Sequence, residues 1–123
     1  MINAKRIYKR LLTDTRITAL IDEENIQSSY PAEIEIYPCI IFLDDAQADS
    51  EYSDNKPDAS CCEVEIHIYS KKLTGFVSTA DVAVEIAAVM AEDLWHCPVN
   101  REVPDPVPDV EHRVMRFNKS IFN

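Results

Sequence analysis

The chain has 123 residues, a net charge of −10 at pH 7, 46% hydrophobic residues and 28% charged residues. This composition is typical of one globular domain and excludes a disordered chain. The negative charge repels nucleic-acid phosphate, and no apolar run approaches the roughly 18 residues of a membrane span. The first ten residues lack the apolar stretch of a signal peptide. We therefore expect neither specific nucleic-acid binding nor membrane binding.

The first predicted element is an amphipathic helix that ends near Thr13 and Asp14. Its apolar face follows helical spacing and consists of Ala4, Ile7, Tyr8, Leu11 and Leu12. Its other face is basic and consists of Lys5, Arg6, Lys9 and Arg10. The apolar-rich residues 16–21 fit either a helical turn or a short strand, and the polar residues 22–29 predict a loop.

Two strands are predicted in the middle of the chain. Residues 39–43 form a continuous apolar run that predicts a strand covered on both faces, and Pro38 marks its start because proline cannot donate a ladder hydrogen bond. Residues 62–70 alternate, with Cys62, Val64, Ile66 and Ile68 on one face and Glu63, Glu65, His67 and Tyr69 on the other. We expect His67 to be a surface residue. The acidic residues 44–60 between the strands predict either a loop or a protruding hairpin.

The second half of the chain predicts one helix and two further strands. Ser78 and Asp81 resemble a capping box, and the helix is expected to run to about Trp95. Its broad apolar arc consists of Val82, Ala83, Ile86, Ala87, Val89, Met90 and Leu94, and packs either on the sheet alone or also on a neighbouring subunit. Residues 99–103 predict an edge strand flanked by prolines, and residues 110–117 the final strand.

Together these elements predict one α+β domain over residues 1–123. Its sheet is expected to be mainly antiparallel, with about four strands packed by two main helices, in the order helix, two strands, helix, two strands.

Motifs for catalysis, cofactors or metals are missing from the sequence. Gly75 is the only glycine, which excludes a glycine-rich phosphate loop and a dinucleotide fingerprint. The four cysteines form no C-x-x-C pair, and the histidines form no H-x-x-x-H pair, so we expect reduced thiols and no metal site. A pair of Cys97 with His112 is left open, although nothing in the sequence selects it. We expect no enzyme activity and no cofactor.

Charge is distributed unevenly along the chain. The acidic residues Asp44, Asp45, Asp49, Glu51, Asp54 and Asp58 are opposed in their segment by Lys56 alone. This acidic segment and the basic first helix either make contacts between copies of the chain or are both solvated surfaces.

Several stretches together resemble a known family. They are Arg16-Ile17-Thr18-Ala19-Leu20-Ile21, Tyr37-Pro38-Cys39-Ile40-Ile41-Phe42, Val64-Glu65-Ile66-His67-Ile68-Tyr69-Ser70-Lys71, and Arg113-Val114-Met115-Arg116-Phe117. With the helix that begins at Ala80-Asp81-Val82, this string of elements resembles the tail terminator, or tail-completion, proteins of long-tailed bacteriophages and phage-derived particles. The likeness spans residues 16–122 and consists of strand patterns rather than catalytic signatures.

The resemblance implies a structural, non-enzymatic role in a virion. Such proteins form a ring, usually sixfold, that caps the tail tube, ends its polymerisation and presents the surface for head attachment. The implied partners are further copies of the chain, the tail tube protein and the head–tail connector protein, with DNA passing through the lumen without specific binding. The implied location is the head-proximal end of the tail.

Two residue sets are candidates for these contacts. Some of Asp44, Asp45, Asp49, Glu51, Asp54 and Asp58 are expected to face the lumen or a neighbouring ring, because an acidic lumen lets DNA slide. Lys5, Arg6, Lys9 and Arg10 are their complementary partners between subunits. A head–tail connector or stopper is an alternative within the same class. An acidic adaptor or inhibitor that mimics nucleic acid and binds a basic protein is the alternative from another class.

Overall fold

The computed structural model describes residues 4–27, 36–44 and 59–122, with backbone alone for residues 4–8, 44, 59–62 and 120–122. Along the chain it contains α1 (Ala4–Thr13), α2 (Thr15–Thr18), the 3-10 turn η1 (Glu23–Asn25), β1 (Ile26–Gln27), β2 (Cys39–Asp44), β3 (Ala59–Lys71), α4 (Thr79–Glu92), β4 (His96–Val103) and β5 (Val110–Phe122). The α+β class is confirmed.

The sheet has five strands in the order β1-β2-β3-β5-β4. The β1–β2 pair is parallel and the other three pairs are antiparallel. The prediction of about four strands in a mainly antiparallel sheet was therefore incomplete, because β1 lies where a loop was expected. Two residues are too few to show a strand alternation, so this strand is revealed only by its pairing with β2, Ile26 with Ile40 and Gln27 with Ile41.

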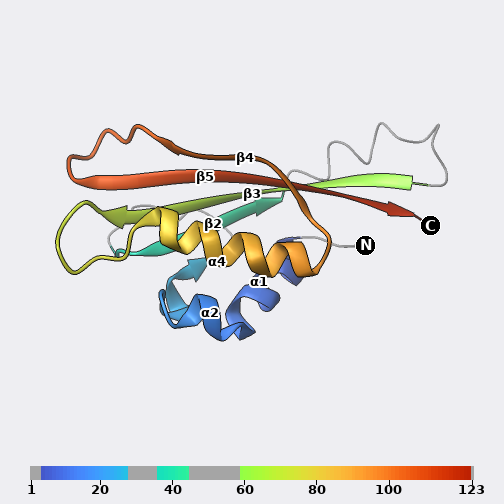
Figure 1. Cartoon of the computed structure of the whole chain (residues 1–123), viewed down its shortest axis with the longest axis horizontal. Coiled ribbons are helices and arrows are strands. Elements are labelled where there is room, and N and C mark those ends of the chain that lie inside the picture. Colours follow the sequence, from blue (N-terminus) through green and yellow to red (C-terminus); the bar gives the residue numbers. More distant parts are fainter. Residues whose placement is uncertain (1–3, 28–35, 45–58, 123) are drawn as a thin grey trace.

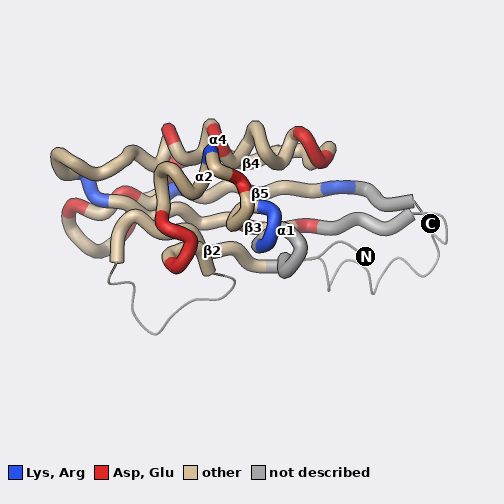
Figure 2. The backbone as a smooth tube through the Cα atoms, turned by 90° about the horizontal axis from the view of Figure 1, so that it is seen from below, with Lys and Arg blue, Asp and Glu red and all other residues tan. Residues whose placement is uncertain are grey.

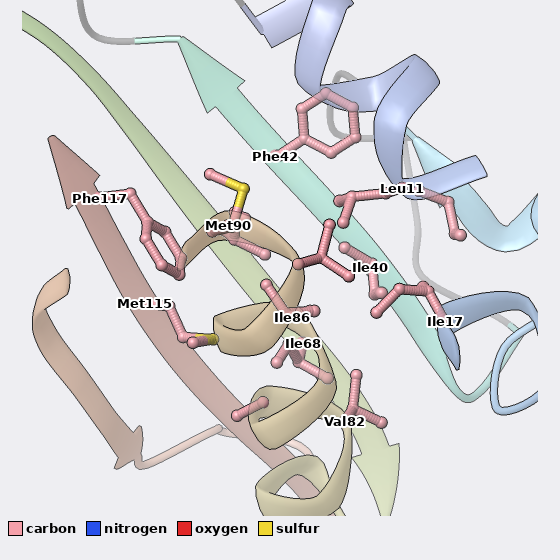
Figure 3. Packing of buried hydrophobic residues seen from close by; sticks show 14 of the residues in the cluster. Leu11, Ile17, Ile40, Phe42, Ile68, Val82, Ile86, Met90, Met115 and Phe117 are labelled. Atoms are coloured by element: carbon pink, nitrogen blue, oxygen red, sulfur yellow. The ribbon is translucent and has the colours of Figure 1, made fainter. Parts of the chain in front are cut away.

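The described helices all lie on one face of the sheet (Figure 1). The core between the sheet and the helices is formed by β1, β2, β3 and β5 from the sheet and by α1, α2 and α4 from the helix layer. Figure 3 shows Phe42, Ile68 and Met115 of the sheet facing Ile86 and Met90 of α4, with Leu11 and Ile17 at the side. Of the predicted apolar face of β3, Val64, Ile66 and Ile68 belong to this core and are at most 1% exposed, and the Cys62 side chain lies outside the described part of the chain.

Strand β2 is covered on both faces, as its continuous apolar run predicts. Ile40 and Phe42 belong to the main core, whereas Cys39 and Ile41 pack with Tyr69 and other residues on the opposite face. The strand begins directly after Pro38, in agreement with the prediction.

Helix α4 begins as predicted and ends earlier than predicted. The Ser78 hydroxyl accepts a hydrogen bond from the Asp81 backbone nitrogen at 3.1 Å. The helix ends at Glu92, because Leu94 adopts a left-handed backbone (φ 67°) and the Trp95 nitrogen donates back to the Met90 carbonyl at 3.1 Å. This is the Schellman pattern of helix termination. Leu94 is 81% exposed, so its assignment to the apolar arc was wrong.

Strands β4 and β5 form the other side of the sheet. The edge strand β4 starts at His96, three residues before its predicted start, and an irregularity separates His96 from Val99 in its pairing with β5. Strand β5 runs five residues beyond its predicted end and pairs with β3 over its whole length, from Val110 to Phe122.

Because β2 pairs with β3 only from Val64 onward, and β4 pairs with β5 only as far as Asn118, the last part of the β3–β5 pair extends beyond the other strands. We call residues 59–62 and 119–122 the arm.

Candidate functional site

The predicted basic surface lies on α1. Lys9 is exposed, and the side chains of Lys5 and Arg6 lie outside the part that the structure describes. The Arg10 guanidinium binds within its own chain, at 2.7 Å from Glu92, 3.3 Å from Asp14 and 3.5 Å from Asp93. Figure 2 shows acidic positions along α4 and basic positions in α1. The intersubunit role of the basic residues stays a prediction, and Arg10 already has intramolecular partners.

The predicted acidic surface falls almost entirely outside the described residues. Asp44 is the last residue of β2 and its backbone pairs with Val64. Asp45, Asp49, Glu51, Asp54 and Asp58 belong to residues 45–58, which the structure does not describe. Their position at a lumen or between rings therefore stays a prediction.

An ion-pair network holds the helix layer together. Asp14 caps α2, because its Oδ1 accepts a hydrogen bond from the Arg16 backbone nitrogen at 2.9 Å. The same carboxylate lies 2.8 Å from Arg16 Nη2, and Arg16 Nη1 lies 2.8 Å from Glu92 of α4. The hydrogen bond from the Arg16 side chain is the largest cause that lowers the pKa of Asp14, to about 2. The network joins the end of α1, the start of α2 and the end of α4.

A second polar network crosses the sheet face that lies opposite the helices. His67 of β3 and His112 of β5 share a hydrogen bond of 2.8 Å between Nδ1 and Nε2. His67 Nε2 lies 2.5 Å from the Glu65 carboxylate, whose second oxygen accepts from Arg116 Nε at 2.9 Å. The Tyr69 ring stacks on His112 with 4.2 Å between centroids. A continuous chain of hydrogen bonds across the two strands therefore joins His112, His67, Glu65 and Arg116.

Burial and hydrogen bonding together shift the pKa values of His112 and Glu65 in this network. Burial of His112, followed by the charge of His67, lowers the pKa of His112. Burial acts to raise the pKa of Glu65, but the hydrogen bonds from His67 and Arg116 outweigh it, and the pKa is lowered. His67 itself is only 9% exposed, so its prediction as a surface residue was wrong. The alternation of β3 identifies the face on which His67 lies, but it cannot tell whether that face is covered.

The network fits a structural role better than a catalytic one. The two ring nitrogens 2.8 Å apart can hold one proton between them, which ties β3 to β5. Cys97 packs against the core on the helix side, so the structure does not bring it to His112. Within the described ranges, no group of three or more histidine, cysteine or acidic side chains could hold a metal ion.

A third surface is the end of the molecule that carries both the loop 72–77 and the loop 104–109 (Figure 1), where the Lys72 nitrogen donates to the Asp109 carbonyl at 2.7 Å. We call it the loop end. Its exposed apolar side chains are Leu73, Phe76 and Val107, and Lys72, Glu102 and the proline-rich loop line a pocket of about 490 Å³ there. The sequence analysis did not identify this surface. The only signal for it was apolar residues inside segments that are otherwise typical of turns.

Comparison with known proteins supports the fold. No protein-family model matches the chain, and no curated protein matches it. Among solved structures, it is similar to a chain from a structure titled "Virion of native gene transfer agent (GTA) particle", with a TM-score of 0.64 and 15% sequence identity. The match covers 95% of this chain and 92% of the other. At this identity the likeness establishes a shared fold. No helix among the described residues is long and apolar enough to cross a membrane.

Proposed function

We propose that this chain is a structural protein of a phage-like virion and that it forms a ring that caps the tail tube. The observation that carries the proposal is the fold shared with a chain of a gene transfer agent virion over nearly the whole length of both proteins. The strand patterns that resemble those of tail terminators support the assignment as the ring that caps the tail tube. The chain acts in assembly rather than as an enzyme, and its partners are its own copies, the tail tube protein and the head–tail connector protein.

The decisive experiment removes the gene from the genome that encodes the particle and measures tail length by electron microscopy. A tail terminator ends tube growth, so its loss leaves overlong tubes and unattached heads, and a wild-type copy of the gene restores normal tails. Loss of a head–tail connector leaves tails of normal length beside filled, unattached heads. Particles of normal form and number refute both roles and favour the acidic adaptor.

The acidic segment has a specific place in this proposal. Residues 44–58 carry six acidic residues against Lys56, a net charge of −6 + 1 = −5. Copies of this segment around a ring form an acidic lumen that repels DNA and keeps it free to slide.

The lumen proposal is tested by replacing Asp49 and Asp54 with lysine and measuring DNA release from purified particles. The matched control is Glu24→Lys, which reverses an exposed acid in η1. Slower release in the double variant alone supports an acidic lumen. Equal release and equal assembly in both variants rule it out.

A further inference from the structure

The histidine network has one ring nitrogen that faces a carboxylate from a loop. His112 Nδ1 lies 3.9 Å from Asp105 Oδ2, which is too far for a hydrogen bond. Both side chains are largely buried, with exposed fractions of 13% for His112 and 12% for Asp105. Asp105 belongs to the loop 104–109 between β4 and β5, and His112 lies in β5. A hydrogen bond between the two side chains would therefore join this loop to the sheet.

Hydrogen-bond geometry determines which ring nitrogens carry protons. Against the effect of burial, hydrogen bonds from His67 and Arg116 lower the pKa of Glu65, so this carboxylate is an acceptor and His67 Nε2 donates to it. One proton lies between His67 Nδ1 and His112 Nε2, because two lone pairs or two N–H groups 2.8 Å apart would repel each other. Two neutral imidazoles carry two N–H protons in all, and these two positions account for both.

His112 Nδ1 is therefore the position that an added proton occupies. This holds whichever ring carries the formal charge, because the two histidines share a proton and titrate as a pair. Before proton uptake, a nitrogen lone pair faces a carboxylate oxygen, and neither atom can donate. After proton uptake, His112 Nδ1 is a donor and Asp105 is its acceptor.

The loop is prepared to accept this hydrogen bond. The Asp105 Oδ1 accepts from the Val107 nitrogen at 2.9 Å, which holds the carboxylate in place within the loop. A charge-assisted hydrogen bond between nitrogen and a carboxylate has a length of about 2.8 Å, so a movement of about 1 Å closes the gap of 3.9 Å.

The neutral ionisable groups beside the pair do not change this contact. Burial raises the pKa of the Cys39 thiol to about 11, and burial, followed by Cys39 and then Asp105, raises the pKa of the Tyr37 phenol. Both groups therefore stay neutral in the range in which histidine titrates. Tyr69 of β3 stacks its ring on His112, with 4.2 Å between the centroids.

The cations on this side of the sheet carry the same charge throughout. Arg116 lies 2.9 Å from Glu65, Lys71 lies over the Tyr37 ring, and Arg101 of the edge strand β4 is exposed. Lysine and arginine side chains stay charged across the range in which histidine titrates. The change of charge beside the loop therefore comes from the histidine pair.

We infer that proton uptake by the histidine pair closes a hydrogen bond from His112 Nδ1 to Asp105 Oδ2, which holds the loop 104–109 against the sheet. We call this contact the latch. Residues of the loop line the pocket at the loop end, so the latch acts on the wall of that pocket. The latch lies within one copy of the chain and does not depend on the proposed ring.

The latch closes in mildly acidic solution. Burial, followed by the charge of His67, lowers the pKa of His112, so proton uptake occurs below pH 6.5. The folded chain binds this proton less well than the unfolded chain does, so acid lowers the global stability while it orders the loop. These opposite effects distinguish the latch from partial unfolding of the loop.

Nitrogen NMR of the chain labelled with ¹⁵N-histidine tests the proton positions. At pH 8 both His67 and His112 are expected to be Nε2–H tautomers, and acidification to pH 5 is expected to add the proton at His112 Nδ1. His96→Gln and His112→Phe variants assign the signals. An Nδ1–H tautomer of His112 at pH 8 overturns the inference.

A substitution in the loop tests the partner of His112. Asp105→Asn keeps an oxygen that can accept from the Val107 nitrogen and removes a charge that acts to raise the pKa of His112. It is expected to lower this pKa by about one unit, a tenfold weaker proton binding. The control Asp109→Asn removes an exposed charge of the same loop, at a positive φ that asparagine tolerates, and is expected to leave the titration of His112 unchanged. An unchanged titration in Asp105→Asn, or an equal shift in both variants, overturns the inference.

Amide hydrogen exchange tests whether the loop is held. The Val107 and Val110 nitrogens donate within the loop and at its end, so their protection reports its opening. After correction for the intrinsic effect of pH, this protection is expected to rise about fivefold or more from pH 8 to pH 5 in the wild type, and to stay constant in Asp105→Asn. Thermal unfolding checks that both variants fold. Equal protection at the two pH values in the wild type overturns the inference without any variant.

Discussion

Replacing Asp14 by alanine is expected to destabilise the chain by about 2 kcal/mol, with about half from the lost helix cap and half from lost ion pairs. The Asp14 carboxylate accepts from the Arg16 backbone at 2.9 Å and from Arg16 Nε at 3.0 Å, and it also lies 3.3 Å from Arg10 Nη1. Loss of an N-cap costs about 1 kcal/mol. Each of the two arginine side chains is about a third exposed, so each ion pair contributes about 0.5 kcal/mol.

Urea denaturation at pH 7 measures this loss. Asp14→Asn keeps an oxygen that can cap the helix and removes the charge, so it is expected to lose about 1 kcal/mol, the ion-pair part alone. Glu24→Ala removes an exposed acid of η1 and is expected to change stability by less than about 0.5 kcal/mol.

The pH dependence of the stability difference between wild type and Asp14→Asn tests whether the Asp14 charge stabilises the fold. The pKa of Asp14 is lowered from 3.8 to about 2 in the folded chain, so its charge stabilises the fold above pH 3.8, and this contribution is lost as pH falls through about 2. The stability difference between the wild type and Asp14→Asn should therefore be constant from pH 5 to 7 and shrink toward pH 2. A difference that stays constant down to pH 2, or an alanine variant as stable as wild type, refutes the reasoning.

Three further predictions concern single positions. The pKa of His112 is lowered from 6.5 by burial and then by His67, so stability present above pH 6.5 is lost as pH falls below it; His112→Phe should weaken the pH dependence of urea midpoints between pH 7.5 and 5. Burial raises the pKa of the Cys39 thiol to about 11, so Cys39 should resist maleimide until urea unfolds the chain. Leu94→Gly should stabilise the chain and Gly75→Ala should destabilise it, each by about 1 kcal/mol, because both positions have positive φ. A lower thermal midpoint in Leu94→Gly, or an unchanged or higher one in Gly75→Ala, contradicts this.

Local sequence patterns predicted the elements whose signal lies within one segment. Helix α4 and strand β3 were found because their apolar residues repeat with the period of a helix and of a strand, respectively. Pro38 located the start of β2 through its missing donor. The end of α4 was missed because Leu94 occupies a left-handed position where glycine is usual, so the sequence contains no glycine that would predict the end of the helix there.

Features that depend on strand pairing could not be read from the sequence. The histidine network exists because the register places His67 opposite Val114 and Tyr69 opposite His112, which brings the two imidazoles of neighbouring strands together. The sequence analysis put His67 on the correct face of β3, but no local pattern shows which β5 residues share that face. The arm could not be predicted for the same reason, because it arises where β3 and β5 extend beyond their pairing with β2 and β4. The candidate charged surfaces were chosen from composition, and Arg10 shows that a basic position on a helix can be bound within its own chain.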